Sequence, residues 1–296
     1  MQPKPDPCYS FLNIPQSIID WYPIMFKNTD DKGGVFRDRS QLTSEEVEPI
    51  GREEEIERIR DALAPLNHRN PCENLLIHGP AGTGKTTCVK HVFNQLENET
   101  RVKTVWINCW QYNTRSSLLT ELLIQLGYPA PRKGKPVDEL LSKTREWLDK
   151  NRCIAITLDE FDQMNEKTEI AYDLQLLNAK ADNQIGVVMI SNQPPAELNL
   201  DPRSQSRLNH QTLEFQPYTK DELVTILKER AEKAFHPGKV TDTALERIAE
   251  FNADKEGDCR KALTQLRRLG RGVKEKRQDK ITEAIVESTS VTEDKK

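Results

Sequence analysis

A glycine-rich loop limits the folds that are open to this chain. It fits the pattern G-x-x-x-x-G-K-[ST] and consists of Gly79, Pro80, Ala81, Gly82, Thr83, Gly84, Lys85 and Thr86. A short apolar run, Asn74–His78, precedes the loop, and a helical pattern over residues 85–96 follows it. Glycines let successive backbone N–H groups turn toward one anion, and the following helix presents its positive end to the same anion. The pattern predicts a phosphate-binding loop of the Walker A type between a strand and a helix.

Nucleotide binding is expected from the residue types at the end of this loop. We expect the Lys85 ammonium to reach the β- and γ-phosphates of ATP or GTP, and the Thr86 hydroxyl to ligate Mg²⁺. The next residue, Thr87, is counted with the loop among the nucleotide-binding residues. The alternative is a glycine-rich turn without a ligand, which the flanking strand and helix disfavour. The sequence therefore predicts ATP and Mg²⁺ as cofactors.

A pair of acids, Asp159 and Glu160, ends a later apolar run over residues 153–158. Alone, such a pair is a weak signal, but after a Walker A loop it predicts the second half of a phosphate site. We expect Asp159 to bind the nucleotide through the Mg²⁺ shell, and Glu160 to orient and polarise the attacking water. The presence of Glu160 predicts hydrolysis as well as binding.

A polar residue, Asn192, follows the next apolar run, residues 185–190. At this strand end, between the two halves of the phosphate site, its side chain could hold the γ-phosphate or the water. The alternative is a turn-forming asparagine, which is a common role for this residue type. The loop and the acid pair in the same chain favour the first interpretation.

Apolar runs alternate with helical patterns up to about residue 216, which indicates βαβ units and a mostly parallel sheet. Further strands are expected over 102–109 and 213–215, and further helices over 52–63, 114–126 and 137–150. After Pro217, apolar residues recur only at helical spacing, over 220–235, 242–251 and 258–272. We therefore predict an α/β fold, with a P-loop base domain built on a parallel sheet and a small all-helical domain.

The predicted divisions are an N-terminal extension that is partly flexible (1–45), the base domain (46–216), the helical domain (217–287) and a disordered tail (288–296). The extension contains an aromatic stretch, residues 11–26. We interpret this stretch as a short element packed on the main domain. A partner-binding segment is the alternative.

Composition and charge argue against several classes of protein. The 296 residues are 36% hydrophobic and 30% charged, as in an ordinary globular protein. No apolar run approaches the roughly 18–20 residues that span a bilayer, and the N-terminus does not read as a signal peptide. The six scattered cysteines suggest neither zinc nor disulfides. We expect a cytoplasmic protein without a membrane partner. The net charge of −4 argues mildly against DNA, without excluding a local basic face.

Two further stretches follow these motifs, 201–208 (DPRSQSRL) and 257–263 (GDCRKAL). The combined order resembles that of AAA+ ATPases. More narrowly, it resembles the archaeal replication-initiator family, which is related to origin recognition complex subunit one and cell division control protein six. The Walker A loop is shared by many families, whereas these two stretches together are much more specific. The resemblance runs from about residue 35 to residue 288, with shorter matching stretches at 35–38, 107–109, 172–174 and 230–235.

This resemblance implies roles for a set of residues around the phosphate site. Asn192 is similar to the sensor 1 residue. Arg260 resembles the sensor 2 arginine, which reaches from the helical lid to the γ-phosphate. Arg207 resembles the arginine finger that completes a neighbour's site, which implies self-association or a heteromeric AAA+ partner. A guanidinium can offset charge on the transferring phosphoryl group, although a solvated loop arginine is the alternative for Arg207. With Glu160, these residues form the expected catalytic set.

DNA is the further partner that the resemblance implies. Residues 114–127 fall where such initiators carry a helical insertion that touches DNA. Modest positive charge comes from Arg115 near the start of this segment, and from Arg132, Lys133 and Lys135 after it. A solvated basic loop is the alternative. Family members usually continue into a C-terminal winged-helix domain. Such a domain is not expected here, because the sequence stops at Lys296.

Three functions fit these observations. The first is an ATP-controlled switch in DNA replication initiation, acting in origin binding or helicase loading. The second is an ATP-dependent regulatory adaptor without its own DNA binding, which the net negative charge favours. The third is a clamp-loader-like subunit, whose family shares the GDxRKAL stretch and the Ser-Arg pair.

Overall fold

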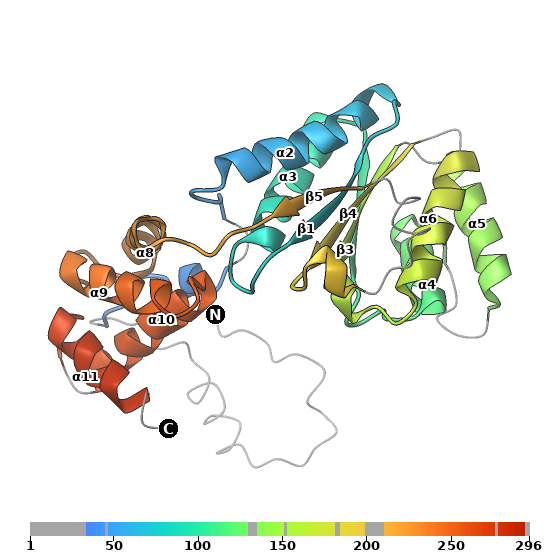
Figure 1. Cartoon of the computed structure of the whole chain (residues 1–296). Coiled ribbons are helices and arrows are strands. Elements are labelled where there is room, and N and C mark those ends of the chain that lie inside the picture. The colour runs from blue at the N-terminus through green and yellow to red at the C-terminus, as the bar shows by residue number, and fades with distance from the viewer. Residues whose placement is uncertain are drawn as a thin grey trace, which may run out of the picture.

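The computed structural model describes residues 34–44, 47–129, 135–150, 153–180, 184–198, 210–275 and 278–293. These residues form a base built on a β-sheet and a helical lid that follows it in the chain (Figure 1). The aromatic stretch 11–26 and the stretch 201–208, with Arg207, lie outside the described residues. Within the described part of the chain, no helix has the length and apolar character that crossing a bilayer requires.

The base sheet has five strands in the order β2-β3-β4-β1-β5, and neighbouring strands are parallel. In chain order they are β1 (Asn74–His78), β2 (Lys103–Asn108), β3 (Ile154–Asp159), β4 (Ile185–Ser191) and β5 (His210–Glu214). β3 and β4 are buried at every position. Helices cover both faces of a parallel sheet, which explains why these strands read as unbroken apolar runs. The parallel α/β prediction is confirmed, and β4 lies between β1 and β3 as expected.

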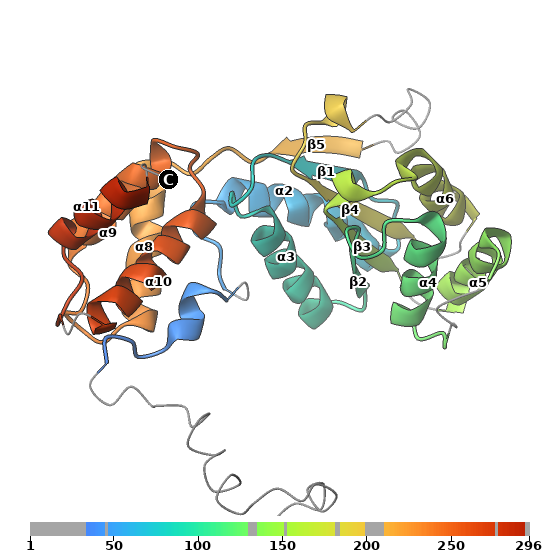
Figure 2. The ribbon, with the colours of Figure 1, turned by 90° about the horizontal axis from the view of Figure 1, so that it is seen from below.

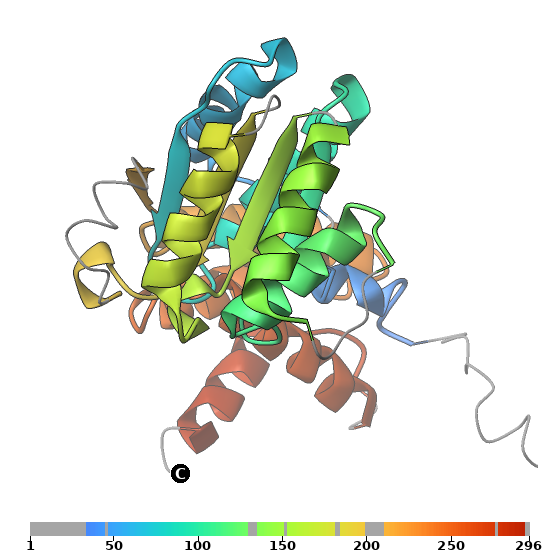
Figure 3. The same ribbon diagram turned by 90° about the vertical axis from the view of Figure 1, so that its right-hand side faces the viewer.

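Helices pack on both faces of this sheet (Figure 3). α2 (Glu53–Leu63) and α3 (Lys85–Glu99) share a buried cluster with one face of β1, whereas α4 (Arg115–Gln125) and α6 (Lys167–Lys180) share another with the opposite face. α5 (Val137–Lys150) packs against the outer side of α4. The sequence did not predict α6. Its apolar residues cover much of the helix circumference, so no amphipathic stripe marks it.

The lid consists of α8 (Lys220–Ala234), α9 (Asp242–Ala253), α10 (Cys259–Glu275) and α11 (Glu283–Glu293). The first three helices match the expected ones, but α11 was not predicted. The expected disordered tail is therefore wrong for residues 288–293, which continue α11. This helix is largely polar and is anchored in the lid core by Val286, next to the buried Ile281. A helix attached by so few apolar side chains leaves little periodic signal in the sequence.

The segment 34–44 belongs to the lid, although it lies before the base in the sequence. Val35, Phe36 and Leu42 are buried in the lid core. The rings of Phe36 and Phe235 stack with their centroids 4.7 Å apart. A short 3₁₀ helix, η2 (Arg39–Leu42), lies against α8 and α10, as the blue ribbon in Figure 2 shows. The expectation of a separate extension up to residue 45 is therefore wrong for residues 34–44, because their apolar side chains complete the core of the lid.

Candidate nucleotide-binding site

A cleft of about 530 Å³ lies between the base and the lid, which is within the usual range for small-molecule sites. We call it the interdomain cleft. Its base side is formed by the phosphate loop and α3 (82–87 and Lys90), Trp106, Asn108, Asp159, Glu160 and residues 190–192. Its other side is formed by the N-terminal segments 42–44 and 47–50, by Tyr218, and by Ile226, Arg230, Cys259, Arg260, Leu263 and Thr264 of the lid. Predicted site residues from the phosphate loop and α3 (82–87), from the ends of β3 and β4, and from α10 therefore line one cavity.

The phosphate loop leads directly into α3 and leaves the start of that helix open. Gly84, the residue before α3, has φ 93° and makes no capping hydrogen bond through a side chain. This left-handed backbone suits glycine because it has no Cβ. The first N–H groups of a helix have no partners within the helix. At α3 they are therefore available to an anion.

Lys85 is the first residue of α3 and is 5% exposed. Its Nζ donates hydrogen bonds to the carbonyls of Gly79 (2.6 Å) and Pro80 (2.7 Å) and to Asn192 Oδ1 (3.0 Å). Burial, together with the nearby charge of Arg260, lowers the pKa of Lys85 to about 8. The ammonium is thus held over the loop by neutral oxygens, which phosphate oxygens would replace as stronger acceptors.

Thr86 and Asp159 bring two oxygen atoms together beside Lys85. The Thr86 Oγ1 and Asp159 Oδ1 are 3.5 Å apart, and Asp159 is buried. Among the described residues, no group of three or more His, Cys, Asp or Glu side chains could hold a metal ion by itself. Mg²⁺ is commonly bound through one or two protein oxygens, with substrate phosphates and waters completing its shell. The donor set therefore fits Mg²⁺ that arrives with a nucleotide.

Glu160 and Asn192 lie in the lining of the cleft at the ends of β3 and β4. Glu160 has φ 56°, an uncommon left-handed conformation for a residue other than glycine, and its N–H donates to Asp159 Oδ1 (3.0 Å). The N–H of Asn192 donates to Asp162 Oδ1 (3.1 Å), while its side chain accepts from Lys85. Backbone strain of this kind clusters at functional sites.

The lid meets the phosphate loop at the start of α10. The N–H of Cys259 donates to the Gly82 carbonyl (3.2 Å). A Cβ added at Gly82, which has φ 76°, would lie 1.8 Å from Asp258 Oδ1, so only glycine allows this approach. Arg260 follows in the same turn of α10 and lines the cleft. The geometry therefore brings the predicted lid arginine to the same cavity as Lys85.

Comparisons with known proteins agree with this architecture. A model of the AAA domain matches residues 68–197, and a model of the Cdc6 AAA+ ATPase-type lid domain matches residues 224–290. This chain belongs to the AAA+ family. Across both domains it resembles the archaeal replication initiators of the Orc1 and Cdc6 type.

Individual proteins that resemble this chain in sequence or structure are replication proteins of the same type. An ORC1-type DNA replication protein of Pyrococcus abyssi is 32% identical over 248 residues, covering 79% of this chain and 59% of that protein. The structure of the Aeropyrum pernix ORC1 protein in complex with DNA matches with a TM-score of 0.77 and 29% identity, covering 87% of this chain and 70% of that one. The Aeropyrum pernix ORC2 protein, solved as ADPNP-ADP complexes, has a TM-score of 0.73 and 23% identity over 86% and 71% of the two chains. This likeness concerns the fold. The chain thus spans about 59% of the length of the Pyrococcus relative.

Several residues of the AAA+ cleft were not found from the sequence. Residues 42–44 and 47–50 line the cleft, and Arg230 of α8 fastens the first of these segments by donating to the carbonyls of Gln41 (2.8 Å) and Ser44 (3.3 Å). Ile50, Ile226 and Leu263 add apolar lining on the side of the cleft opposite the base, as a nucleobase requires. The matching stretch 35–38 was the available signal that this segment is part of the fold, but spacing alone does not link it to α8.

Of the basic residues expected near DNA, the two that the structure describes, Arg115 and Lys135, form ion pairs within the AAA+ base. Arg115 donates from Nε to Asp173 Oδ2 (2.5 Å) and from Nη2 to Asp173 Oδ1 (2.6 Å), and Asp173 is fully buried. Lys135 pairs with Glu139. Arg132 and Lys133 lie outside the described residues, as does Arg207. The Arg115 pair fastens α4 to α6, so the positive charge predicted at the start of 114–127 serves packing in this structure.

Proposed function

We propose that this protein binds ATP with Mg²⁺ in the interdomain cleft, hydrolyses it slowly, and acts as an ATP-controlled switch in the initiation of DNA replication. The observation that carries the proposal is the convergence of four features on one cavity. They are the open start of α3, the Thr86–Asp159 oxygen pair, the Glu160–Asn192 pair and Arg260 from the lid. A purely structural P-loop fold would not need a lid arginine beside the phosphate loop.

Each cleft residue has one task in the proposed reaction. Lys85 and the N–H groups of α3 bind the phosphates, and Thr86 and Asp159 would hold Mg²⁺, which would offset negative charge on the phosphates. Glu160 accepts a hydrogen bond from the water and takes its proton as the water oxygen bonds to the γ-phosphorus. The bond from that phosphorus to the bridging oxygen breaks, giving ADP and phosphate. Asn192 orients the water, and Arg260 offsets charge on the transferring group.

DNA and a second AAA+ subunit are the proposed partners. The relatives named above are replication proteins, and one of them was solved with DNA. We propose that Arg207 supplies an arginine finger to a neighbouring subunit, which would make turnover depend on protein concentration. These relatives do not favour the adaptor or the clamp-loader-like alternative. The cytoplasmic location stays a prediction.

The test is DNA binding by fluorescence anisotropy with ATP, with ADP and without nucleotide, across a salt series. Salt must be varied because phosphate contacts alone give salt-dependent affinity without sequence preference. We expect tighter binding in one nucleotide state, with a clear salt slope. No binding at low salt in any state would contradict the DNA part of the proposal and would return attention to a protein partner.

The hydrolytic part is tested separately with Glu160→Gln. We expect ATP to remain bound and its turnover to fall by about 100-fold or more, because the variant cannot accept the proton of the water. Glu57→Gln, an exposed substitution on α2, is the matched control. Unchanged turnover in Glu160→Gln would show that the role assigned to Glu160 is wrong.

A further inference from the structure

The linker between base and lid, residues 215–218, forms backbone hydrogen bonds with both of them. It joins β5 to α8. On the base side, the N–H of Phe215 donates to the His78 carbonyl (2.8 Å), directly before the phosphate loop. On the lid side, the N–H of Tyr218 donates to the Gly257 carbonyl (3.2 Å), directly before Asp258. This short segment is therefore hydrogen-bonded to the base at one end and to the lid at the other, so rotation of the lid relative to the base would disturb these bonds.

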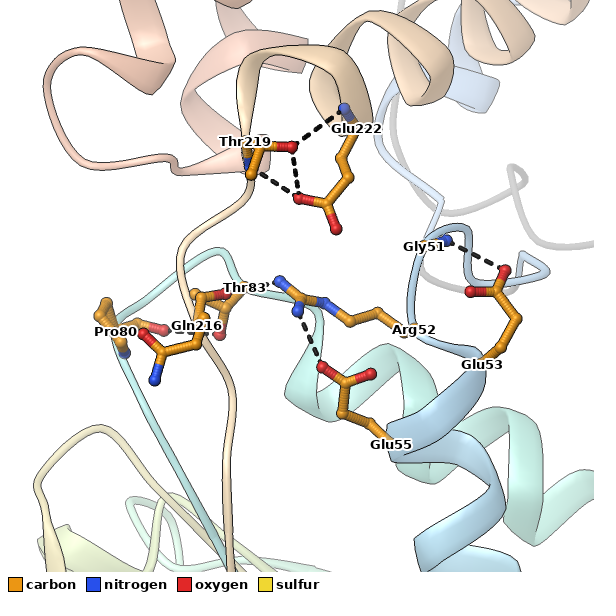
Figure 4. Close-up of polar contacts among 9 residues, drawn as sticks. All are labelled: Gly51, Arg52, Glu53, Glu55, Pro80, Thr83, Gln216, Thr219 and Glu222. Atoms are coloured by element: carbon orange, nitrogen blue, oxygen red, sulfur yellow. Dashed lines mark hydrogen bonds and ion pairs between the residues drawn. The ribbon is translucent and has the colours of Figure 1, made fainter.

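Arg52 holds the linker from the start of α2. Its Nη2 donates to the Gln216 carbonyl (2.6 Å), and its Nη1 donates to Glu55 Oε1 (2.9 Å). The guanidinium carbon lies 4.1 Å from the centre of the Tyr218 ring. Figure 4 shows Arg52 reaching from α2 toward Gln216, with Glu55 beside its other nitrogen. The residue is 4% exposed, so these contacts form away from water, where a cation over a ring interacts most strongly.

Tyr218 continues this contact into the phosphate loop. A Cβ added at Gly84 would lie 2.5 Å from the Tyr218 hydroxyl oxygen. The hydroxyl therefore lies against the backbone of the residue that precedes α3. Arg52, Tyr218 and Gly84 form a continuous contact from α2, across the linker, to the loop that is expected to bind phosphate.

The Arg52 guanidinium keeps its charge although it is buried. Burial disfavours its charged form, but Tyr218 and Glu55 outweigh burial and raise the pKa of Arg52 above its ordinary value. Within the described part of the chain, its buried Nε has no hydrogen-bond partner. Native proteins rarely leave a buried donor unpaired.

We propose that Arg52 is a positioning residue that sets the angle of the lid and couples it to the phosphate loop through Tyr218. This inference rests on the proposed ATP site, because the group that Arg52 positions is Arg260 on the lid. ADP lacks the γ-phosphate that Arg260 would contact. Loss of the fixed lid angle therefore weakens ATP binding and leaves ADP binding nearly unchanged.

The experiment is isothermal titration of a non-hydrolysable ATP analogue and of ADP, both with Mg²⁺, into the full chain. In Arg52→Met we expect the dissociation constant of the analogue to rise by about tenfold, and that of ADP to stay within about twofold. Arg52→Lys keeps the charge but not the planar fork, so an intermediate loss for the analogue is expected. Arg58→Met, an exposed substitution on the same helix, is the control and should change neither constant.

A double-mutant cycle distinguishes positioning from a purely structural role. In a background of Arg260→Ala, Arg52→Met should cause no further loss of analogue affinity. Both substitutions remove the same interaction, the contact of Arg260 with the γ-phosphate. Tyr218→Phe keeps the ring beneath the guanidinium and loses only the hydroxyl against Gly84. It should reduce analogue affinity by about threefold, and it tests the coupling even if Arg52→Met does not fold.

Equal weakening of both nucleotides, or additive losses in the cycle, would overturn the inference. If the wild-type protein binds both nucleotides and the ratio of their dissociation constants is unchanged in Arg52→Met, the Arg52 inference is overturned and the proposed function is not. Absence of binding of either nucleotide by the wild-type protein would instead overturn the proposed function.

Discussion

Two helices begin at the same cleft, and they begin in opposite ways. α3 follows Gly84, which provides no side-chain cap. α10 follows Asp258, whose Oδ1 accepts from the N–H groups of Arg260 (2.8 Å) and Lys261 (3.2 Å). The two starts are in contact, because the N–H of Cys259 donates to the Gly82 carbonyl.

The difference separates two ways of meeting a phosphate. An uncapped helix start keeps its N–H donors and its positive end for an anion. A helix start that a carboxylate already caps has its donors satisfied and its positive end partly neutralised. α3 can therefore bind phosphate through its backbone, whereas α10 is left to act through the Arg260 side chain. The base is suited to hold a nucleotide, and the lid is suited to sense which nucleotide is held.

The largest expected effect is on the α3 side. Lys85→Ala removes the buried ammonium, and we expect affinity for both ATP and ADP to fall by at least about 100-fold. Titration calorimetry with each nucleotide measures this. Retained ADP binding within about tenfold would mean that the backbone of α3 suffices without the lysine.

The contact between the two helix starts is tested with Gly82→Ala. The new Cβ meets Asp258 Oδ1 and occupies a left-handed backbone position, so we expect the free energy of unfolding to fall by about 2–4 kcal/mol. Gly127→Ala is the matched control, because Gly127 has φ 98° and nothing within 4 Å of an added Cβ. Its loss should be about 1 kcal/mol. Equal losses in urea unfolding would show that the lid does not rest on the loop in solution.

Proton linkage at Lys85 should make nucleotide affinity depend on pH. Burial lowers the pKa of Lys85 to about 8 in the free protein, and a bound phosphate would raise it. The bound state then keeps a proton that the free protein loses, so affinity is full below about pH 8 and falls as pH rises, by at most about tenfold per unit. Calorimetry in buffers of different ionisation enthalpy measures this proton uptake. Lys85→Arg stays charged and should abolish it.

The ligand-free protein should respond to pH with the opposite sign. The ordinary pKa of a lysine in an unfolded chain is 10.5, whereas the pKa of Lys85 in the folded protein is about 8. Between these values the unfolded chain binds more protons than the folded one, so this group makes the free energy of unfolding rise with pH. The measurement is the free energy of unfolding as a function of pH. If it rises no more steeply in the wild-type protein than in Lys85→Arg, the lowered pKa of Lys85 is contradicted.

The smallest expected effect is on the α10 side. Asp258→Ala removes the cap and should lower the free energy of unfolding by about 1 kcal/mol. Thr241→Ala removes the comparable cap of α9, where the Thr241 side chain accepts from the N–H of Ala244, away from the phosphate loop. Both variants should lose similar stability in urea unfolding, but only Asp258→Ala should change nucleotide affinity. If Thr241→Ala changed affinity equally, general loosening of the lid would explain both.

Local patterns in the sequence were sufficient for the strands and the phosphate loop of the base, although not for α6. The phosphate loop, the Asp159–Glu160 pair and the apolar strands depend on residues that are near one another in the chain, so spacing alone predicts them. The parallel arrangement of the strands followed from the same alternation, because parallel strands require crossover helices. The roles of Glu160, Asn192, Arg207 and Arg260 stay predictions, although the described three line one cleft.

Only the tertiary structure decided how the lid side is built. Residues 34–44 join the core of α8 and α10, Arg230 fastens that segment over the cleft, and Arg52 reaches Gln216 from the start of α2. α11 depends on Val286 reaching the same core, and Arg115 is occupied by Asp173 on a different helix. Each of these outcomes joins residues that are far apart in the chain. Such contacts leave no periodic signal, because the partner that satisfies a buried cation or completes a core is chosen by packing in three dimensions.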